Sequence, residues 1–518
     1  MTPTSDGPRN RMLIAVLVAF ALVASACGDD SSENSAAESR IDAINDVDVA
    51  QLGPQEGEGS DEGSQDGGAE RADDEAADDG AGEDADSTAA TDQGDDGGAA
   101  SAANGVLTVG DGFGTIQAAV DAASPGDLVM IPAGTYNEAV EVSTENLTIR
   151  GMERNEVILD GELTLDNGFR VVETDGVAIE NMTIQNYTNN GVFFTGVTGY
   201  RASYITAMRF GGYGLYAFDS YSGQFDNSYT SGAADGGVYV GECFPCDAVV
   251  TDIVSEWNGL GFSGTNAGGD LFVINSTYRH NRAGIVPNSG MYEFCFPQRG
   301  NTVAGNLVHD NNNSDTAAID AAVLSRGNGI LVAGGSGNTV IMNRVMDHNV
   351  TNIAAILFQD EESNFALPAE PVSCDESRQL PVLDEPTTVI FGSNDNIVTD
   401  NVTADAGIAD LALAMPSQAG NCFADNEFGS TAPVDLEVLA PCGGDGPADG
   451  DFSTANGGLD LGALIAAEQP PGLDYETVEL PDPGPQASMP DADNAPARPA
   501  TDVPMAVDLD AITVPPAP

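Results

Sequence analysis

Three histidines are the side chains of this chain best suited to moving a proton near neutral pH. His280, His309 and His348 each stand at or just after the end of a short apolar run, beside an asparagine or an aspartate. A neighbouring carboxylate such as Asp310 or Asp347 could hold an imidazole in the orientation that general acid–base catalysis needs. These five residues are therefore the candidate catalytic groups.

The residues around the histidines indicate a binding surface for a sugar. Trp257 is the only tryptophan and stands at the matching end of the preceding repeat, while Arg279 and Arg282 lie on either side of His280. An aromatic ring flanked by guanidinium, imidazole and carboxylate groups suits a sugar ring that carries carboxylates. We therefore expect Trp257, Arg279 and Arg282 to bind a polysaccharide.

A purely structural interpretation of the same residues stays open. Polar turns of a repeat protein collect Asn, Asp and His because these residues tolerate a left-handed backbone and hydrogen-bond to it. The histidines also differ in their spacing from the repeated asparagines, so their side chains need not converge. The oxygen-rich run from Asp310 to Asp315 could bind Ca²⁺ through these two carboxylates, although such runs are usually solvated turns. No other cofactor is expected.

The candidate residues must be positioned by a repeat that runs through the middle of the chain. A glycine followed by apolar residues recurs about every 22 to 23 residues at first, a period typical of solenoid proteins. These glycines are Gly191, Gly214, Gly237, Gly259, Gly284 and Gly329. Short apolar runs bounded by Asn and Gly precede them and indicate strands. Two or three short strands per coil, joined by right-handed crossovers, predict a parallel β-helix.

Asparagines mark the register of the coils. If they occupy like places in successive coils about 4.8 Å apart, their amides can form a hydrogen-bonded ladder along the helix. We predict this structural role for Asn181, Asn227, Asn275, Asn306, Asn343, Asn401 and Asn426.

The start of the repeat array carries an amphipathic helix. A helix at residues 115–123 would place Ile116, Ala119 and Val120 on one face, ahead of a strand at Leu128–Pro132. Such a helix can cover the open end of a solenoid, where the core would otherwise be exposed.

This stretch resembles the N-terminal cap of the pectate-lyase-like right-handed β-helix proteins, and with the asparagine-rich coils the resemblance covers residues 106–442. Within that superfamily, the coils, the ending Gly420–Cys442 and the tail look most like exported bacterial parallel β-helix repeat proteins, often lipoproteins, whose function is not established. The resemblance implies a place in the cell envelope. Because members of this group tend to occur alongside an exported c-type cytochrome, it also implies such a cytochrome as a partner.

Enzymes of this superfamily use motifs that the sequence mostly lacks. Polygalacturonase-type hydrolysis needs clustered aspartates on neighbouring coils, and no adjacent Asp-Asp pair occurs within them. Pectate-lyase chemistry needs Ca²⁺ and an arginine or lysine base, but lysine is absent and the arginines follow no family pattern. We therefore favour a non-catalytic protein that binds a glycan or an envelope protein. A lyase or hydrolase acting on acidic polysaccharide is the alternative.

The cysteines indicate a protein exported from the cytoplasm. Apart from Cys27, which follows an apolar run, their number is six, and an even number in an exported protein favours disulfides over metal ligands. The close spacing of Cys243 and Cys246 predicts a local bridge. We pair the others as Cys295–Cys374 and Cys422–Cys442, although sequence alone does not fix the connectivity.

The two ends of the chain differ in composition from the coils. Residues 1–26 resemble a bacterial lipoprotein signal peptide, so we expect Cys27 to be acylated, with ordinary secretion as the alternative. Residues 27–104 are rich in Asp, Glu, Gly and Ala and predict a disordered acidic tether. Residues 443–518 are rich in Pro, Asp and Ala and predict a largely disordered tail. The β-helix domain would then span residues 105–442.

The formal net charge of −66 limits the partners of the chain. Such a charge repels nucleic acid and anionic lipid, so nucleic acid is excluded and the membrane is reached only through the lipid anchor. The predicted fold class is therefore all-β: a right-handed, single-stranded parallel β-helix with an N-terminal capping helix, an acidic tether and a Pro/Asp-rich tail.

Overall fold

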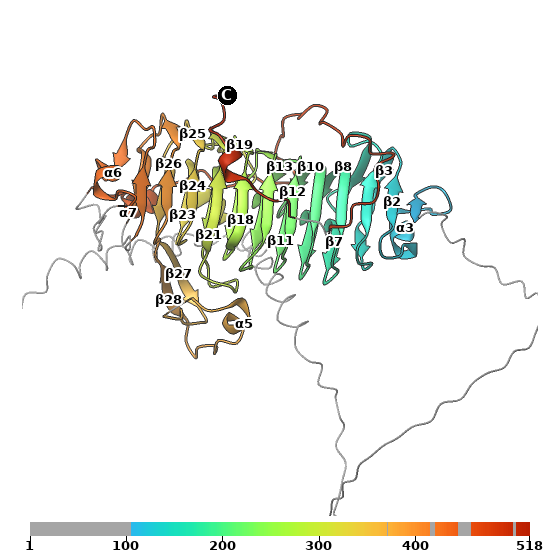
Figure 1. The fold of residues 1–518 in the computed structure, drawn as a ribbon, viewed down its shortest axis with the longest axis horizontal. Helices are drawn as coiled ribbons and strands as arrows, with labels where there is room; N and C mark the ends of the chain where they lie inside the picture. The colour runs from blue at the N-terminus through green and yellow to red at the C-terminus, as the bar shows by residue number, and fades with distance from the viewer. Residues whose placement is uncertain (1–104, 370, 415–419, 444–456, 501–503) are drawn as a thin grey trace, which may run out of the picture. The chain divides into compact units, whose positions relative to one another are not determined.

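The folded part of the chain is a parallel β-helix (Figure 1). The computed structural model describes residues 105–369, 371–414, 420–443, 457–500 and 504–518. Strands of successive coils pair in parallel in three ladders, at the spacing of the sequence repeat: Leu215 pairs with Val192 on one side and with Val238 on the other. The predicted signal peptide, the acylated Cys27 and the acidic tether lie outside the described residues.

The three ladders account for nearly all of the strands. The first ladder contains β1 (Val106–Thr108), β2 (Leu128–Ile131), β5 (Thr148–Gly151), β8 (Ala178–Tyr187), β10 (Arg201–Phe210), β12 (Gly223–Asp226), β15 (Ala248–Thr251), β18 (Gly268–Ile274), β21 (Arg299–Ala304), β24 (Thr339–Ile341), β29 (Ile397–Thr399) and β32 (Cys422–Ala424). The second contains β3 (Gly134–Tyr136), β6 (Val157–Asp160), the ends of β8 and β10, β13 (Tyr229–Ala233), β16 (Val254–Glu256), β19 (Thr277–Arg279), β22 (Leu307–His309), β25 (Arg344–Met346) and β30 (Val402–Ala404). The third contains β4 (Val140–Val142), β7 (Asn167–Val172), β9 (Asn190–Thr195), β11 (Leu215–Phe218), β14 (Gly236–Gly241), β17 (Leu260–Thr265), β20 (Ala283–Asn288), β23 (Asn328–Ala333), β26 (Thr351–Ile356), β31 (Ala409–Leu413) and β33 (Thr431–Ala432).

Inward-facing apolar side chains fill the β-helix. In the first ladder Ile149, Ile179, Ala202, Phe225 and Val250 follow one another on successive coils, and all five are buried. Successive side chains of a strand point to opposite faces, so the residues immediately before and after each of these five in its own strand face outward. Burial of each large apolar side chain contributes about 1.5–3 kcal/mol, which makes this stack the main source of stability.

The predicted capping helix is confirmed as α3 (Ile116–Ala122). Ile116, Ala119 and Val120 are buried against the first coil, while the Thr115 hydroxyl accepts a hydrogen bond from the Ala118 amide at 3.0 Å. This cap satisfies an amide that the first turn of a helix leaves without an intrahelical partner.

The asparagine ladder is confirmed for four of its seven predicted members. The side-chain amide of Asn306 donates to Asn343 at 3.0 Å, Asn343 donates to Asn401 at 3.0 Å, and Asn401 donates to Asn426 at 2.9 Å. The other three predicted members lie one residue earlier in their coils, at left-handed φ values: Asn181, Asn227 and Asn275. There the asparagine fits the turn and does not extend this ladder.

Three disulfides join the six cysteines of the folded region, in the pairs proposed from the sequence: Cys243–Cys246, Cys295–Cys374 and Cys422–Cys442. Stable disulfides of this kind indicate an extracytoplasmic protein. Cys295–Cys374 holds a long insertion between β26 and β29, which contains the antiparallel hairpin β27 (Phe358–Ser363) and β28 (Thr387–Phe391) and the helix α5 (Cys374–Ser377).

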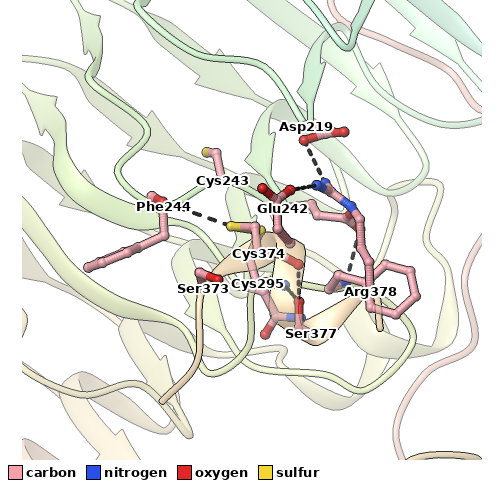
Figure 2. The surroundings of a disulfide bond; sticks show 12 residues. Asp219, Glu242, Cys243, Phe244, Cys295, Ser373, Cys374, Ser377 and Arg378 are labelled. Atoms are coloured by element: carbon pink, nitrogen blue, oxygen red, sulfur yellow. Dashed lines mark hydrogen bonds and ion pairs between the residues drawn. A yellow bond between two sulfur atoms is a disulfide. The ribbon is translucent and has the colours of Figure 1, made fainter. Parts of the chain in front are cut away.

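A partly buried ionic contact accompanies this disulfide. Figure 2 shows Arg378, which follows α5, reaching toward Asp219 and Glu242 on two successive coils. Its guanidinium lies 2.6 Å from the Asp219 carboxylate and 2.9 Å from that of Glu242, whose side chain is 5% exposed. The insertion is therefore attached to the β-helix by one covalent bond and by an ionic contact.

The prediction of a largely disordered tail was wrong for the residues that the structure describes. Residues 469–500 and 504–518, called here the C-terminal strap, lie along the first and second ladders (Figure 1). Five arginines from four coils donate to its main-chain carbonyls: Arg282 to Pro471 (2.6 Å), Arg209 to Val478 (2.8 Å), Arg154 to Ala487 (2.9 Å), Arg150 to Ala495 (2.7 Å) and Arg344 to Pro515 (2.7 Å). A proline-rich segment has few amides to satisfy, so carbonyl acceptors alone can fix it.

Short helices complete the described part of the chain: α4 (Asp320–Leu324), α6 (Leu436–Leu439), α7 (Leu461–Ala466) and the 3₁₀ helix η3 (Leu509–Ala511). None of the helices at described positions has the length and apolar composition needed to span a membrane.

Candidate binding site

The predicted Trp/His zone lies where the second ladder turns toward the third. Register pairs Ser231 with Glu256, Glu256 with Arg279, and Arg279 with His309. The residues that follow these strand ends all have left-handed φ values and form one row along successive coils: Gly232 (77°), Trp257 (61°), His280 (55°), Asp310 (55°) and Asp347 (61°). This group is called the turn row below.

Four of the predicted residues come together in this zone. The rings of Trp257 and His280 are 5.4 Å apart, and those of His280 and His309 are 5.8 Å apart. His309 is 5% exposed, and its Nδ1 lies 2.8 Å from the Asp310 carboxylate. Its buried Nε2 makes no hydrogen bond to the described residues.

His348 does not join the other histidines, which corrects the expectation of a three-histidine groove. Its side chain points inward and is 2% exposed. Nδ1 lies 2.7 Å from the side-chain oxygen Oδ1 of Asn352, and Nε2 lies 3.1 Å from the side-chain nitrogen Nδ2 of Asn311. His348 thus ends an inner ladder that runs from Asn258 through Asn281 and Asn311. Burial lowers the pKa of His348 to about 4, so the ring is a neutral structural group at physiological pH.

The two arginines expected to bind a ligand have other partners. Arg279 Nε lies 2.5 Å from a carboxylate oxygen of Glu256. Arg282 is fully buried, and its guanidinium donates to the carbonyls of Pro470, Pro471 and Ser314. The prediction that Arg282 binds ligand was therefore wrong: it fastens the C-terminal strap.

The ionisable residues of the zone have shifted pKa values and do not gather as a carboxylate and histidine cluster among the described residues. Burial first, and then the charges of Asp310 and Asp405, raise the pKa of Asp347. Burial lowers the pKa of His280 below its ordinary value. Nowhere in the described residues do three or more His, Cys, Asp or Glu side chains gather in a metal-binding arrangement.

A hollow of about 710 Å³ opens beside Trp257. The preceding member of the turn row is Gly232, and the Leu480 side chain of the strap occupies the space beside it. On the following coil His280 packs on the indole. The strap forms the other wall, from Leu473 to Pro481, and Asp315 completes the lining. This arrangement leaves a partly exposed aromatic surface facing a space large enough for a small ligand.

The strap wall of the hollow is firmly attached. Tyr475 and Val478 are buried and pack with Ala234 and Ala317. Their carbonyls accept hydrogen bonds from Arg209 at 2.7 and 2.8 Å. Sequence analysis missed this wall, and the signal that could have found it is the apolar spacing of Tyr475, Val478 and Leu480 within an otherwise polar tail.

A second aromatic cluster lies on the third ladder. Phe193 and Tyr216 stack with centroids 5.1 Å apart, and Tyr216 stacks on Tyr239 at 4.8 Å. Tyr216 and Tyr239 are buried, and the Tyr239 hydroxyl donates to Glu293 at 2.5 Å. Rings that stack on one another in this way stabilise neighbouring coils and present their edges, so Trp257 is the better candidate for a ligand platform.

Comparison with known proteins agrees with this architecture. The family described as right handed beta helix region matches residues 167–366. The fold is a right-handed parallel β-helix. No curated protein sequence matches the chain significantly.

Solved structures with a similar fold have low sequence identity to this chain. The mannuronan C-5 epimerase AlgE4 A-module of Azotobacter vinelandii is 15% identical, with a TM-score of 0.40 over 60% of this chain and 90% of that one. DFA-IIIase of Arthrobacter chlorophenolicus is 11% identical, with a TM-score of 0.39 over 61% and 86%. Pectate lyase Pel9A is 11% identical, with a TM-score of 0.34 over 61% and 72%.

Proposed function

We propose that this chain is a cell-envelope protein, anchored through an acylated Cys27, whose β-helix binds a glycan at the hollow beside Trp257 without catalysing its breakdown. The observation that carries the proposal is the partly exposed Trp257, which lines a hollow together with the C-terminal strap and Asp315. Sugar rings bind to aromatic surfaces of this kind through their apolar faces, and nearby polar groups orient them.

The remaining members of the predicted zone support binding more than turnover. His348 is a buried structural group, and Arg279 and Arg282 are held by Glu256 and by the strap. An envelope protein, including the exported cytochrome implied by the resemblance, is the other class of partner and stays a prediction.

One observation favours the alternative of a polysaccharide-active enzyme. His309 and Asp310 form a close pair, and Nε2 of His309 makes no hydrogen bond to the described residues. A histidine oriented by a carboxylate, with its second nitrogen unengaged, can act as a general base if substrate reaches it. A catalytic role would require a movement that exposes this ring, because His309 is 5% exposed.

The experiment that tests the proposal uses the full-length chain and a panel of polysaccharides and oligosaccharides. Binding is followed by calorimetry in the native chain, in Trp257→Ala and in Tyr292→Ala, which removes an aromatic side chain that is 50% exposed and does not line the hollow. We expect binding of at least one glycan that is lost in Trp257→Ala and kept in Tyr292→Ala. Equal binding by all three proteins would reject the site.

The same panel separates binding from catalysis. Unsaturated uronate absorbance and new reducing ends are recorded with and without Ca²⁺. Product formation that is abolished in His309→Ala would establish the enzyme in place of the binding protein. Binding without product supports the proposal.

A further inference from the structure

We infer that the hollow beside Trp257 selects a ligand that carries an ammonium group, such as an amino sugar or a quaternary amine. This inference rests on the proposed binding site and names its ligand class. It reverses the charge that the sequence predicted, because the sequence indicated a carboxylate-bearing sugar bound by Arg279 and Arg282.

The charged side chains that line the hollow are acidic. Asp315, Asp474 and Glu479 line it together with the indole of Trp257, and all three carboxylate residues are exposed. Asp474 accepts a hydrogen bond from the Glu476 amide at 3.0 Å. The Glu479 carboxylate makes no hydrogen bond to the described residues, so it is available to a ligand.

The nearby guanidinium groups are engaged by the protein itself. Arg209 lies beneath the strap and donates to the Tyr475 and Val478 carbonyls. Arg282 is fully buried and donates to Pro470 and Pro471, and Arg279 is paired with Glu256. None of these three arginines lines the hollow, whereas three carboxylates do, so a uronate in the hollow would meet carboxylates.

An indole surface surrounded by carboxylates has a distinct chemical preference. A cation over the face of tryptophan is attracted by the ring quadrupole, and carboxylates at the rim add Coulombic attraction. His280, on the other side of the indole, has a pKa lowered by burial and so does not add a fixed positive charge near neutral pH. The chain as a whole, with a net charge of −66, draws cations toward its surface.

The test uses the full-length chain and the emission of Trp257, which is its only tryptophan and therefore reports on this site alone. Two pairs of probes differ in charge: choline against 3,3-dimethyl-1-butanol, which has nearly the same shape, and glucosamine against its neutral acetamide, N-acetylglucosamine. Each titration is run at constant ionic strength set with sodium chloride. We expect a saturable change in emission with a charged probe, at least fivefold tighter than with its neutral partner. The pair that shows this preference identifies a quaternary amine or an amino sugar as the source.

Two carboxylate variants and one control locate the charge preference. Asp315→Asn and Glu479→Gln should each weaken binding of the charged probe about two- to fivefold, because each removes one exposed carboxylate of the lining. Glu145→Gln, an exposed carboxylate that does not line the hollow, should leave it unchanged.

The outcomes separate the ligand class from the site. Equal binding of charged and neutral probes, or tighter binding of N-acetylglucosamine, would overturn the ammonium preference while leaving the glycan site intact. No saturable change with any probe, together with glycan binding that survives Trp257→Ala, would overturn both.

Discussion

Arg282 donates a hydrogen bond of 2.6 Å to the carbonyl oxygen of Pro471, 189 residues further along the chain. The guanidinium is fully buried and also bonds to Pro470 and Ser314. Removing it would leave several carbonyls without donors where the strap begins. Arg282→Met should therefore lower the free energy of unfolding by about 2–4 kcal/mol and expose the strap to limited proteolysis.

A matched control exists within the strap. Arg498 is exposed, and its guanidinium makes no hydrogen bond to the described residues. Arg498→Met should change the free energy of unfolding by less than about 0.5 kcal/mol. If denaturant unfolding gave the same midpoint for both variants, the arginine–carbonyl contacts would not hold the strap.

The buried imidazole of His348 should make the stability of the chain depend on pH. As a neutral ring it accepts a hydrogen bond from Asn311 at Nε2 and donates from Nδ1 to Asn352. Protonation would place an N–H at Nε2 against the Asn311 amide. Burial lowers its pKa to about 4 in the folded state, whereas an unfolded histidine titrates near about 6.5.

The direction of this effect follows from proton binding. Between about pH 6.5 and pH 4, His348 is protonated in the unfolded chain but not in the folded chain, so the free energy of unfolding falls as the pH falls. This single group accounts for about 3 kcal/mol over that interval. His348→Asn continues the inner ladder with the same residue type as Asn258, Asn281 and Asn311. Compared with the native chain, this variant should therefore become more stable by about 3 kcal/mol between pH 6.5 and pH 4. Parallel pH profiles for the two proteins would refute the assignment.

The directions of the three histidines show what the sequence could and could not predict. The repeat, the inward apolar residues and the capping helix follow from periodicity, and each was predictable. Each histidine, however, has a different offset from the left-handed residue of its coil: His309 precedes it, His280 occupies it and His348 follows it. A shift of one residue reverses the direction of a side chain. Similar sequence neighbourhoods therefore placed the rings of His280 and His309 in contact but turned His348 into the interior.

The strap shows a second limit of sequence reasoning. Its composition predicts disorder because it has few apolar residues, and the arginines that bind it belong to coils far away in the sequence. Each contact joins a side chain to a main-chain carbonyl, which any residue type supplies. Such contacts leave almost no signature in the sequence of the segment that is bound.

Gly232 should be intolerant of a side chain because of the strap. A Cβ at this position would lie 2.3 Å from Leu480 Cδ1, and φ is +77°. Asparagine tolerates a left-handed backbone better than most residues, so Gly232→Asn mainly tests the contact with the strap. We expect a loss of about 1–3 kcal/mol in the free energy of unfolding and a shift in Trp257 emission as the wall of the hollow moves.

The control for this substitution is Gly337→Asn. Gly337 also has a left-handed φ, of +63°, but nothing lies within 4 Å of its added Cβ. It should retain the native emission and nearly the native stability. An equal loss in both variants would mean that backbone strain, and not the contact with Leu480, sets the cost at Gly232.

Arg378 should hold the long insertion by neutralising a buried carboxylate. Burial raises the pKa of Glu242 to about 7, with the Arg378 charge acting against this rise. Without Arg378, Glu242 would have to bury an unpaired charge or take up a proton. Arg378→Met should therefore cost about 2–3 kcal/mol at pH 8, a value reduced because Arg378 is 26% exposed.

The cost of Arg378→Met should depend on pH in a defined direction. A carboxyl whose folded pKa lies above its unfolded value binds more protons when folded, so its contribution to stability falls as the pH rises from about 4.5 to about 7. The difference between Arg378→Met and the native chain should accordingly be smaller at pH 5, where the loss of the Asp219 contact remains, than at pH 8. Asp375→Asn, which removes the third, 89% exposed carboxylate near Arg378, should change stability little at either pH. A cost of Arg378→Met that does not vary with pH would mean that Arg378 holds the insertion through Asp219 or by packing, independently of the charge on Glu242.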